Sequence, residues 1–161
     1  MAWARTPFLM IVAFLLVGHA GPARAGTDTD ILTVTATVLS ACSLSGGTLN
    51  FGSYTSGQTT NLDVTGVINY VNCSGSLTFG LDGGLSGSVN ARQMQQGASR
   101  LNYQIFRNAV RNAVWGVGAE AQGVVLIGTQ SGSITVYGRI PSGQVVPDGT
   151  YTDTVNITLT F

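Results

Sequence analysis

Apolar and polar residues alternate along much of the chain, with the period of two that is typical of β-strands. The clearest example is the last segment, Tyr151–Phe161. One of its faces carries threonine and asparagine, and the other carries Val155, Ile157, Leu159 and Phe161. Residues 26–39 repeat this pattern, with threonines on one face and Leu32, Val34, Ala36 and Val38 on the other. Both segments are therefore predicted to form amphipathic strands.

The middle of the chain carries further short alternating runs. Apolar residues alternate at 62–70 and again at 77–81, where the run ends in the turn signal Asp82-Gly83-Gly84. Additional strands are predicted at 101–106, 124–128 and 133–138, whereas the pattern at 107–113 fits either a helical turn or a loop. No segment sustains helical spacing with capping residues. The fold class is all-β, and short strands separated by Gly, Ser and Asn suggest an immunoglobulin-like sandwich.

The first 25 residues have the features of a secretory signal peptide. Arg5 precedes the apolar run Phe8–Val17, and Ala23-Arg24-Ala25 has the small-x-small form of a cleavage site. We predict cleavage after Ala25; cleavage after Ala20 is an alternative. A retained anchor is a further alternative, but ten apolar residues are too few to cross a bilayer. The mature protein, starting at Gly26, has the length of one domain.

The chain has two cysteines, Cys42 and Cys73. Export would place them in an oxidising compartment, where a disulfide persists. A Cys42–Cys73 bridge is the predicted state, and two isolated buried thiols are the alternative.

Composition excludes most functions that depend on charged or titratable side chains. There is no lysine, and the only histidine, His19, lies in the predicted signal peptide. The mature chain has five arginines against seven acids, a formal charge of −2, which gives no basic surface for nucleic acid. A serine nucleophile would find no histidine partner. We therefore expect no enzyme, no cofactor and no small-molecule substrate.

The remaining motifs are weak. Residues 116–121 match the loose dinucleotide pattern G-x-G-x-x-A, but no helical pattern follows. The acid pairs Asp28 with Asp30 and Asp148 with Asp153 could serve a glycosidase, yet turn or solvated roles are favoured. Turn chemistry is the preferred role of Asp82 too, which like Asp148 precedes glycine. Trp115 and Tyr137 could stack on a sugar, although core packing is favoured. No ligand set for a metal is present.

Several motifs together resemble the spore coat protein U domain family, which includes subunits of archaic chaperone–usher pili. The matching segments are ACSLSGGTLNFGSY from Ala41, NYVNCS from Asn69, FGLDGG from Phe79, LNYQIFRN from Leu101, VWG from Val114, VYGRIPSGQ from Val136 and DGTYTDTVNITLTF from Asp148. The resemblance covers nearly all of the mature chain. It departs at Asn108, commonly Asp in the family, and at Asn112, usually a small hydroxyl residue.

This resemblance implies an incomplete sandwich that lacks its final strand. A hydrophobic groove then lies beside the C-terminal strand, edged by Val155, Ile157, Leu159 and Phe161. A periplasmic chaperone fills the groove first, and the N-terminal extension of the next subunit replaces it at an outer-membrane usher. The donor strand would be residues 26–39, inserting Leu32, Val34, Ala36 and Val38, and the domain would be residues 40–161. Alternatively, the extension could be an ordinary first strand that pairs within its own domain.

The resemblance also implies a place and a role. The protein is expected to be exported through the periplasm and to form a homopolymeric surface pilus that supports adhesion and biofilm formation. Two rivals are a self-complemented, secreted coat protein and a tip adhesin, although a tip subunit would be expected to carry a second domain. A glycosidase is a third, opposed by the lack of histidine and lysine in the mature chain.

Overall fold

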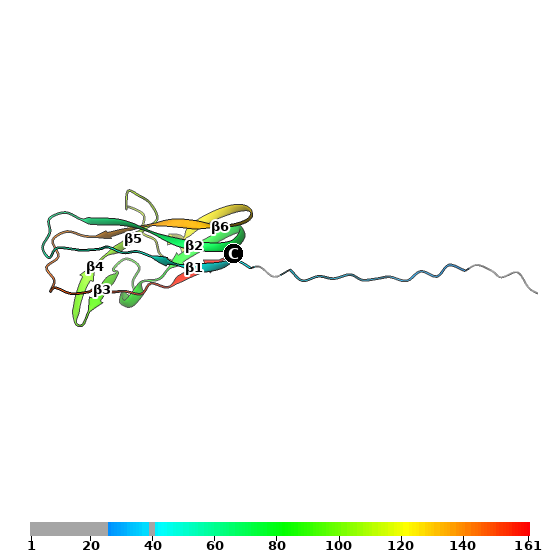
Figure 1. The fold of residues 1–161 in the computed structure, drawn as a ribbon, viewed down its shortest axis with the longest axis horizontal. Coiled ribbons are helices and arrows are strands. Elements are labelled where there is room, and N and C mark those ends of the chain that lie inside the picture. Colours follow the sequence, from blue (N-terminus) through cyan, green and yellow to red (C-terminus); the bar gives the residue numbers. More distant parts are fainter. Residues whose placement is uncertain (1–25, 39–40) are drawn as a thin grey trace, which may run out of the picture. The chain divides into compact units, whose positions relative to one another are not determined.

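The computed structural model describes residues 26–38 and 41–161, and in this part of the chain the fold is all-β (Figure 1). The strands are β1 (Ser43–Thr48), β2 (Leu62–Leu81), β3 (Gln93–Gln96), β4 (Ser99–Asn102), β5 (Gln104–Phe106), β6 (Gln122–Ile140) and β7 (Ile157–Thr160). Two short 3-10 turns, η1 (Gly84–Ser86) and η2 (Gly118–Glu120), lie between strands. The predicted signal peptide, residues 1–25, lies outside the described residues. No helix in the described ranges is long and apolar enough to cross a membrane.

Two long antiparallel strands, β2 and β6, form the centre of the main sheet. Their pairing runs from Leu62 opposite Ile140 to Phe79 opposite Gln122, with irregular register around Cys73. Along its other edge, β2 pairs first with β1 and then, beyond this irregularity, with β7. Strand β5 pairs with the second half of β6, and β3 and β4 form a separate two-stranded sheet. The two sheets are not closed on one another.

The core is made by the inward faces of β2, β5 and β6. Leu77, Phe79, Trp115 and Ile140 are fully buried there. The Trp115 indole donates a hydrogen bond to the Phe79 carbonyl, with 2.8 Å between the heavy atoms. Burial with a satisfied N–H is the favourable state for tryptophan in a core. Core packing is thus confirmed for Trp115, and a sugar-stacking role for its ring is wrong.

The Cys42–Cys73 disulfide is confirmed, and the alternative of two isolated thiols is wrong. It joins the residue just before β1 to the irregular point in the middle of β2. Asn72 beside it has a φ of 55°, and Gly75 has a φ of 78°. The left-handed backbone at these positions allows β2 to change direction without ending, because asparagine and glycine tolerate positive φ.

Two local predictions differ from the structure, and two open alternatives are decided by it. Strand β7 has four residues, whereas the sequence predicted eleven. The backbone of the residues before it bonds instead to side chains or forms isolated bridges, such as that between Thr152 and Gln95. Residues 26–38 form no strand. Of the two alternatives for residues 107–113, the structure shows the loop, which is closed by a hydrogen bond from the Arg107 N–H to the Ala113 carbonyl. The dinucleotide motif at 116–121 leads directly into β6, so its interpretation as a phosphate-binding turn before a helix is wrong.

Candidate functional site

A groove of about 310 Å³ lies between the end of β1 and the segment that leads into β7. One wall is residues 47–51, and the other is residues 151–157. Core side chains form its floor, namely Ile68, Leu81, Ile105 and Val136. The groove therefore opens directly onto the hydrophobic core, where an apolar occupant would be removed from water.

A second cavity of about 630 Å³ continues this groove. The two share lining residues, namely Thr48, Leu49, Phe51, Met94 and Tyr151. The second cavity runs on between residues 48–56 and 146–151, where polar side chains such as Asn50, Ser53 and Asp148 join the lining. We call the two together the acceptor groove. The chain runs in opposite directions along the two walls. Residue numbers rise from 47 to 56 along one wall and fall from 157 to 146 along the other.

At Ile157 the acceptor groove reaches a sheet edge that lacks a partner. Strand β7 pairs with β2 from Ile157 opposite Leu81 to Thr160 opposite Thr78. Within the described residues no strand pairs with its other edge. An edge strand presents unpaired N–H and C=O groups, which can template a further strand. Apolar lining beside an unpaired backbone edge is the arrangement that β-strand addition requires.

Two of the four predicted groove residues, Val155 and Ile157, line the acceptor groove. Leu159 is half-buried and packs against the core without lining the groove, and Phe161 is 59% exposed. Most of the lining lies elsewhere in the chain, in particular Leu49, Phe51, Met94 and Tyr103. The alternation in the last strand could indicate only one wall, since the opposite wall lies about a hundred residues earlier.

Hydrogen bonds to two carboxylates hold the wall that precedes β7. Asp153 accepts the Tyr103 hydroxyl at 2.6 Å and the Leu85 N–H at 2.8 Å. Burial raises the pKa of Tyr103, and the bond to Asp153 adds to this, so the phenol stays a neutral donor. Asp82 accepts the backbone and side-chain N–H groups of Asn156. Burial would raise the pKa of Asp82, but these bonds and one from Gly84 outweigh it and lower the pKa.

Arg92 is fully buried at the end of the same wall, and the sequence reasoning missed it. Its guanidinium donates to the Leu81, Asp82, Val89 and Trp115 carbonyls and to Oε1 of Gln104. Burial lowers the pKa of Arg92. This arginine connects the end of β2, the turn before β3, β5 and the Trp115 segment. A lone arginine between turn residues carries no periodic signal that could have identified it.

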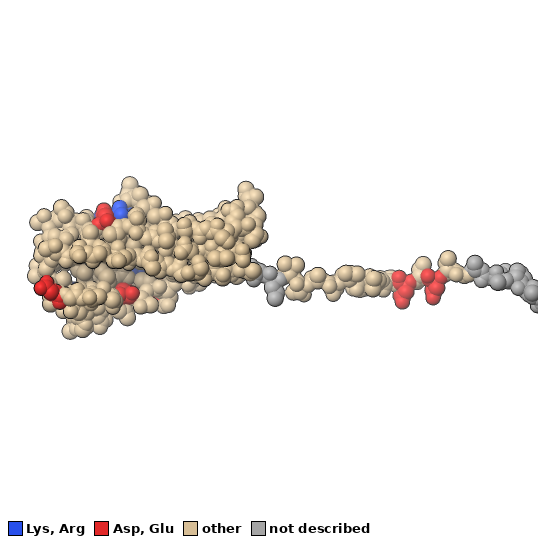
Figure 2. Space-filling view, in the orientation of Figure 1, with Lys and Arg blue, Asp and Glu red and all other residues tan. Residues whose placement is uncertain are grey.

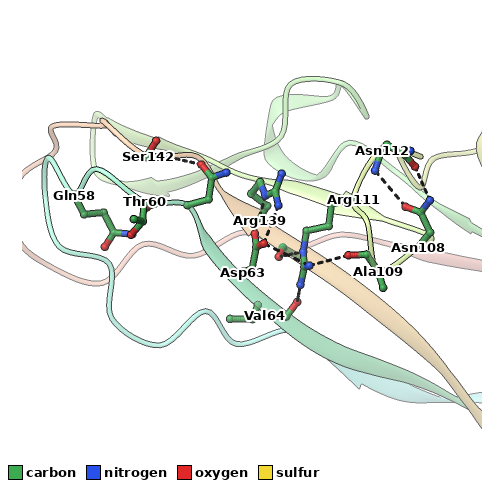
Figure 3. A network of polar contacts seen from close by, with 12 residues as sticks. Gln58, Thr60, Asp63, Val64, Asn108, Ala109, Arg111, Asn112, Arg139 and Ser142 are labelled. Carbon is green, nitrogen blue, oxygen red and sulfur yellow. Dashed lines mark hydrogen bonds and ion pairs between the residues drawn. The ribbon is translucent and has the colours of Figure 1, made fainter.

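A second polar cluster fixes the loop 107–113 to the sheet (Figure 3). Asp63 makes a bidentate contact with Arg139, at 2.7 and 2.8 Å, and lies 3.5 Å from Arg111. The Arg139 hydrogen bond is the main reason that the pKa of Asp63 is lowered. Arg111 also donates to the Gly138 and Val64 carbonyls, so the cluster ties the loop to both central strands.

The extension is described by itself over residues 26–38. Its apolar side chains are exposed, with 82% of Val34 and 91% of Val38 accessible to solvent. Its even-numbered positions from 32 to 38 are apolar, and its odd-numbered positions from 33 to 37 are threonine. The predicted domain boundary at 39–40 lies outside the described residues.

An all-β domain with unclosed sheets and an apolar groove along its last strand has the form of an incomplete sandwich. The chain belongs to the Spore Coat Protein U domain family, whose model matches residues 28–158. It is 37% identical over 160 residues to Protein U of Myxococcus xanthus, a match that covers 87% of this chain and 88% of that protein.

A solved structure shares the fold. It is one chain of the crystal structure of the CsuC–CsuE chaperone–tip adhesion subunit pre-assembly complex, from the archaic chaperone–usher Csu pili of Acinetobacter baumannii. The identity is 26% and the TM-score 0.54, over 78% of this chain. This chain spans only 40% of the matched chain. The fold is thus that of a chaperone–usher pilus protein.

Proposed function

We propose that this protein is a structural subunit of an archaic chaperone–usher pilus, polymerised by donor-strand exchange. The observation that carries the proposal is the acceptor groove, which extends from core side chains to the start of β7, whose outer edge has no strand partner in the described residues. An apolar groove on an unpaired edge is an aggregation hazard unless a strand fills it. The neighbouring subunit supplies that strand.

The extension has the chemistry and length of such a strand. Thirteen residues, 26–38, span roughly 43 Å when extended at about 3.3 Å each. Leu32, Val34, Ala36 and Val38 would face the groove floor, while the threonines between them face solvent. Main-chain hydrogen bonds to β7 supply affinity in this mode of recognition, and alternate side chains in pockets supply specificity.

The proposal implies a set of partners and a location. A periplasmic chaperone lends a strand to the groove before assembly, and an outer-membrane usher exchanges it for the extension of the next subunit. The product is a homopolymeric fibre on the cell surface that supports adhesion and biofilm formation. The similarity to a chaperone–subunit complex supports the chaperone and the neighbouring subunit as partners.

Single substitutions in the extension test the proposal. We expect Val34→Asp and Val38→Asp to abolish fibres, because a charge buried in a dry groove costs several kcal/mol (~3 or more) unless it is paired. Thr33→Asp and Thr35→Asp are matched controls that place the same charge on the outer face, and they should retain fibres. Electron microscopy of the cell surface counts the fibres. Co-purification with the chaperone shows whether each domain still folds.

A second candidate is a secreted coat protein that fills the acceptor groove with its own extension. The family name and the near full-length match to Protein U favour it. In that case Val34→Asp would destabilise the domain itself and prevent its recovery in folded form, whereas donation to a neighbour leaves the chaperone complex intact. Loss of the chaperone complex with Val34→Asp therefore contradicts the polymer proposal.

A further inference from the structure

The first half of β6, residues 122–127, is a second free edge of the sheet (yellow in Figure 1). One side of this segment pairs with the second half of β2, from Gly75 to Phe79. Strand β5 pairs with β6 only at residues 137–139. In the described part of the chain no strand pairs with the far side of residues 122–127. Its outward N–H and C=O groups are therefore available to another strand.

This edge lacks two of the usual features that prevent pairing, charge and proline. Proteins block free edges with charged residues, proline or bulges, but residues 121–138 contain neither a charge nor a proline. Val125 and Ile127 are 78% and 90% exposed, although the residues that alternate with them, Val124 and Leu126, pack against the core. Gly128, with a φ of 73°, ends the regular segment. The short edge 123–127 is apolar on both faces.

Two backbone carbonyls of this segment bond glutamine side chains instead of a strand. The Gly123 carbonyl accepts the Gln122 side-chain N–H at 2.8 Å. The Ile127 carbonyl accepts the Gln130 side-chain N–H at 2.7 Å. In an antiparallel pair, the N–H and C=O groups that point outward from the sheet edge belong to every second residue. Gly123, Val125 and Ile127 are alternate residues of this kind, and Val125 lies midway between the other two. The two amides occupy the positions that N–H groups of a partner strand would take.

We propose that a second copy of this chain pairs here, antiparallel, with a two-fold axis at Val125. Val125 then lies opposite Val125 of the second copy, and Gly123 lies opposite Ile127. This register fits sterically, because the exposed Ile127 side chain faces Gly123, which has no side chain. It also replaces both glutamine amides symmetrically with main-chain N–H groups.

The chemistry of the edge favours its own copy as the occupant. An isologous contact brings the same surface patch of the two copies together, so a patch with charges of one sign would repel itself. This edge carries no charge across eighteen residues (Figure 2). The contact is lateral and shares no residue with the acceptor groove. It would join subunits side by side whether or not they are also joined end to end.

Cysteine cross-linking of the full-length exported protein tests the contact. Directly opposite residues of a hydrogen-bonded pair have Cα atoms about 5.5 Å apart, within reach of a disulfide. Val125→Cys should form covalent dimers on oxidation, seen at twice the subunit mass on a non-reducing gel. Val145→Cys is the matched control, because Val145 is 84% exposed but lies outside any strand. The native cysteines are already paired with each other.

The register gives a second requirement. Gly123→Cys and Ile127→Cys should each cross-link weakly alone and strongly when mixed, and a Cβ at Gly123 meets no atom within 4 Å. Val125→Lys should abolish the lateral association that sedimentation measures and leave end-to-end fibres. Val34→Asp should do the reverse, which separates this contact from donor-strand exchange. Dimer yields from Val125→Cys equal to those from Val145→Cys, or cross-links to a different protein, would overturn the proposal.

Discussion

At the scale of single residues, Arg92 holds together the segments next to the groove wall through its buried hydrogen bonds. Its donors satisfy four backbone carbonyls from three segments, namely the end of β2, the turn before β3 and the Trp115 segment. A buried acceptor without a donor costs about 1–3 kcal/mol. The cost of losing this one side chain is therefore expected to exceed that of losing a typical surface contact.

We expect Arg92→Met to lower the free energy of unfolding by at least about 3 kcal/mol. Urea unfolding can be followed by the fluorescence of Trp115, the only tryptophan after residue 25. Arg100→Met is the control, because Arg100 is exposed and should change stability by no more than about 0.5 kcal/mol. Equal effects of the two substitutions would show that the buried bonds contribute little.

The Asp63 cluster predicts the pH dependence of stability. The folded-state pKa of Asp63 is below its ordinary value of 3.8. The stability that ionised Asp63 contributes is therefore complete above pH 3.8 and disappears as the pH falls through the folded-state pKa. Because the pair is one-third exposed, its contribution is at most about 1 kcal/mol. Urea unfolding at pH 7 and below pH ~3 should show this loss in the native chain and a smaller loss in Asp63→Asn. Asp148→Asn, at an exposed turn, should behave like the native chain.

At the scale of the elements, the disulfide fixes the start of β1 to the middle of β2. The bridge spans 31 residues, and constraint of the unfolded chain over such a loop gives about 3.7 kcal/mol. The double variant Cys42→Ser/Cys73→Ser should be less stable by about this amount in urea. The native protein unfolded under reducing conditions should show the same loss, and an unchanged midpoint in either case would contradict the assignment.

The lengths of the elements show where sequence reasoning succeeds. Alternation predicted all-β structure and located the apolar faces of β2 and β7, because half-burial leaves a period of two in the sequence. The alternation predicted two strands where the structure has the single strand β2, because Asn72 and Gly75 interrupt the pattern. In the structure β2 continues past these residues and pairs with β6 on both sides of them. The second groove wall and Arg92 could not be predicted, because tertiary contacts between distant segments leave no local pattern.

At the scale of the whole molecule, the unfilled groove predicts how the protein behaves when isolated. Produced alone, the protein should aggregate or be degraded, because the apolar groove and the unpaired β7 edge are exposed together. Co-expression with its chaperone should recover a soluble one-to-one complex on size exclusion.

A tethered strand gives the matched comparison. A copy of residues 26–38 fused after Phe161 through a flexible linker should yield a soluble monomer without any chaperone, because the strand is then supplied within one chain. The same fusion with Val34→Asp in the copy should remain aggregated. A stable, monodisperse native subunit without chaperone or fusion would favour self-complementation instead.

The position of the disulfide has a mechanical consequence for a fibre joined through its extensions. Pulling force enters each domain along the chain that leads to Cys42, and the bridge passes it covalently to the middle of β2. There the long ladder with β6 bears the load in shear, across many hydrogen bonds at once. The force therefore does not run along the backbone between the two cysteines, so this segment cannot extend under load. A reduced fibre should therefore lengthen at lower tension than an oxidised one.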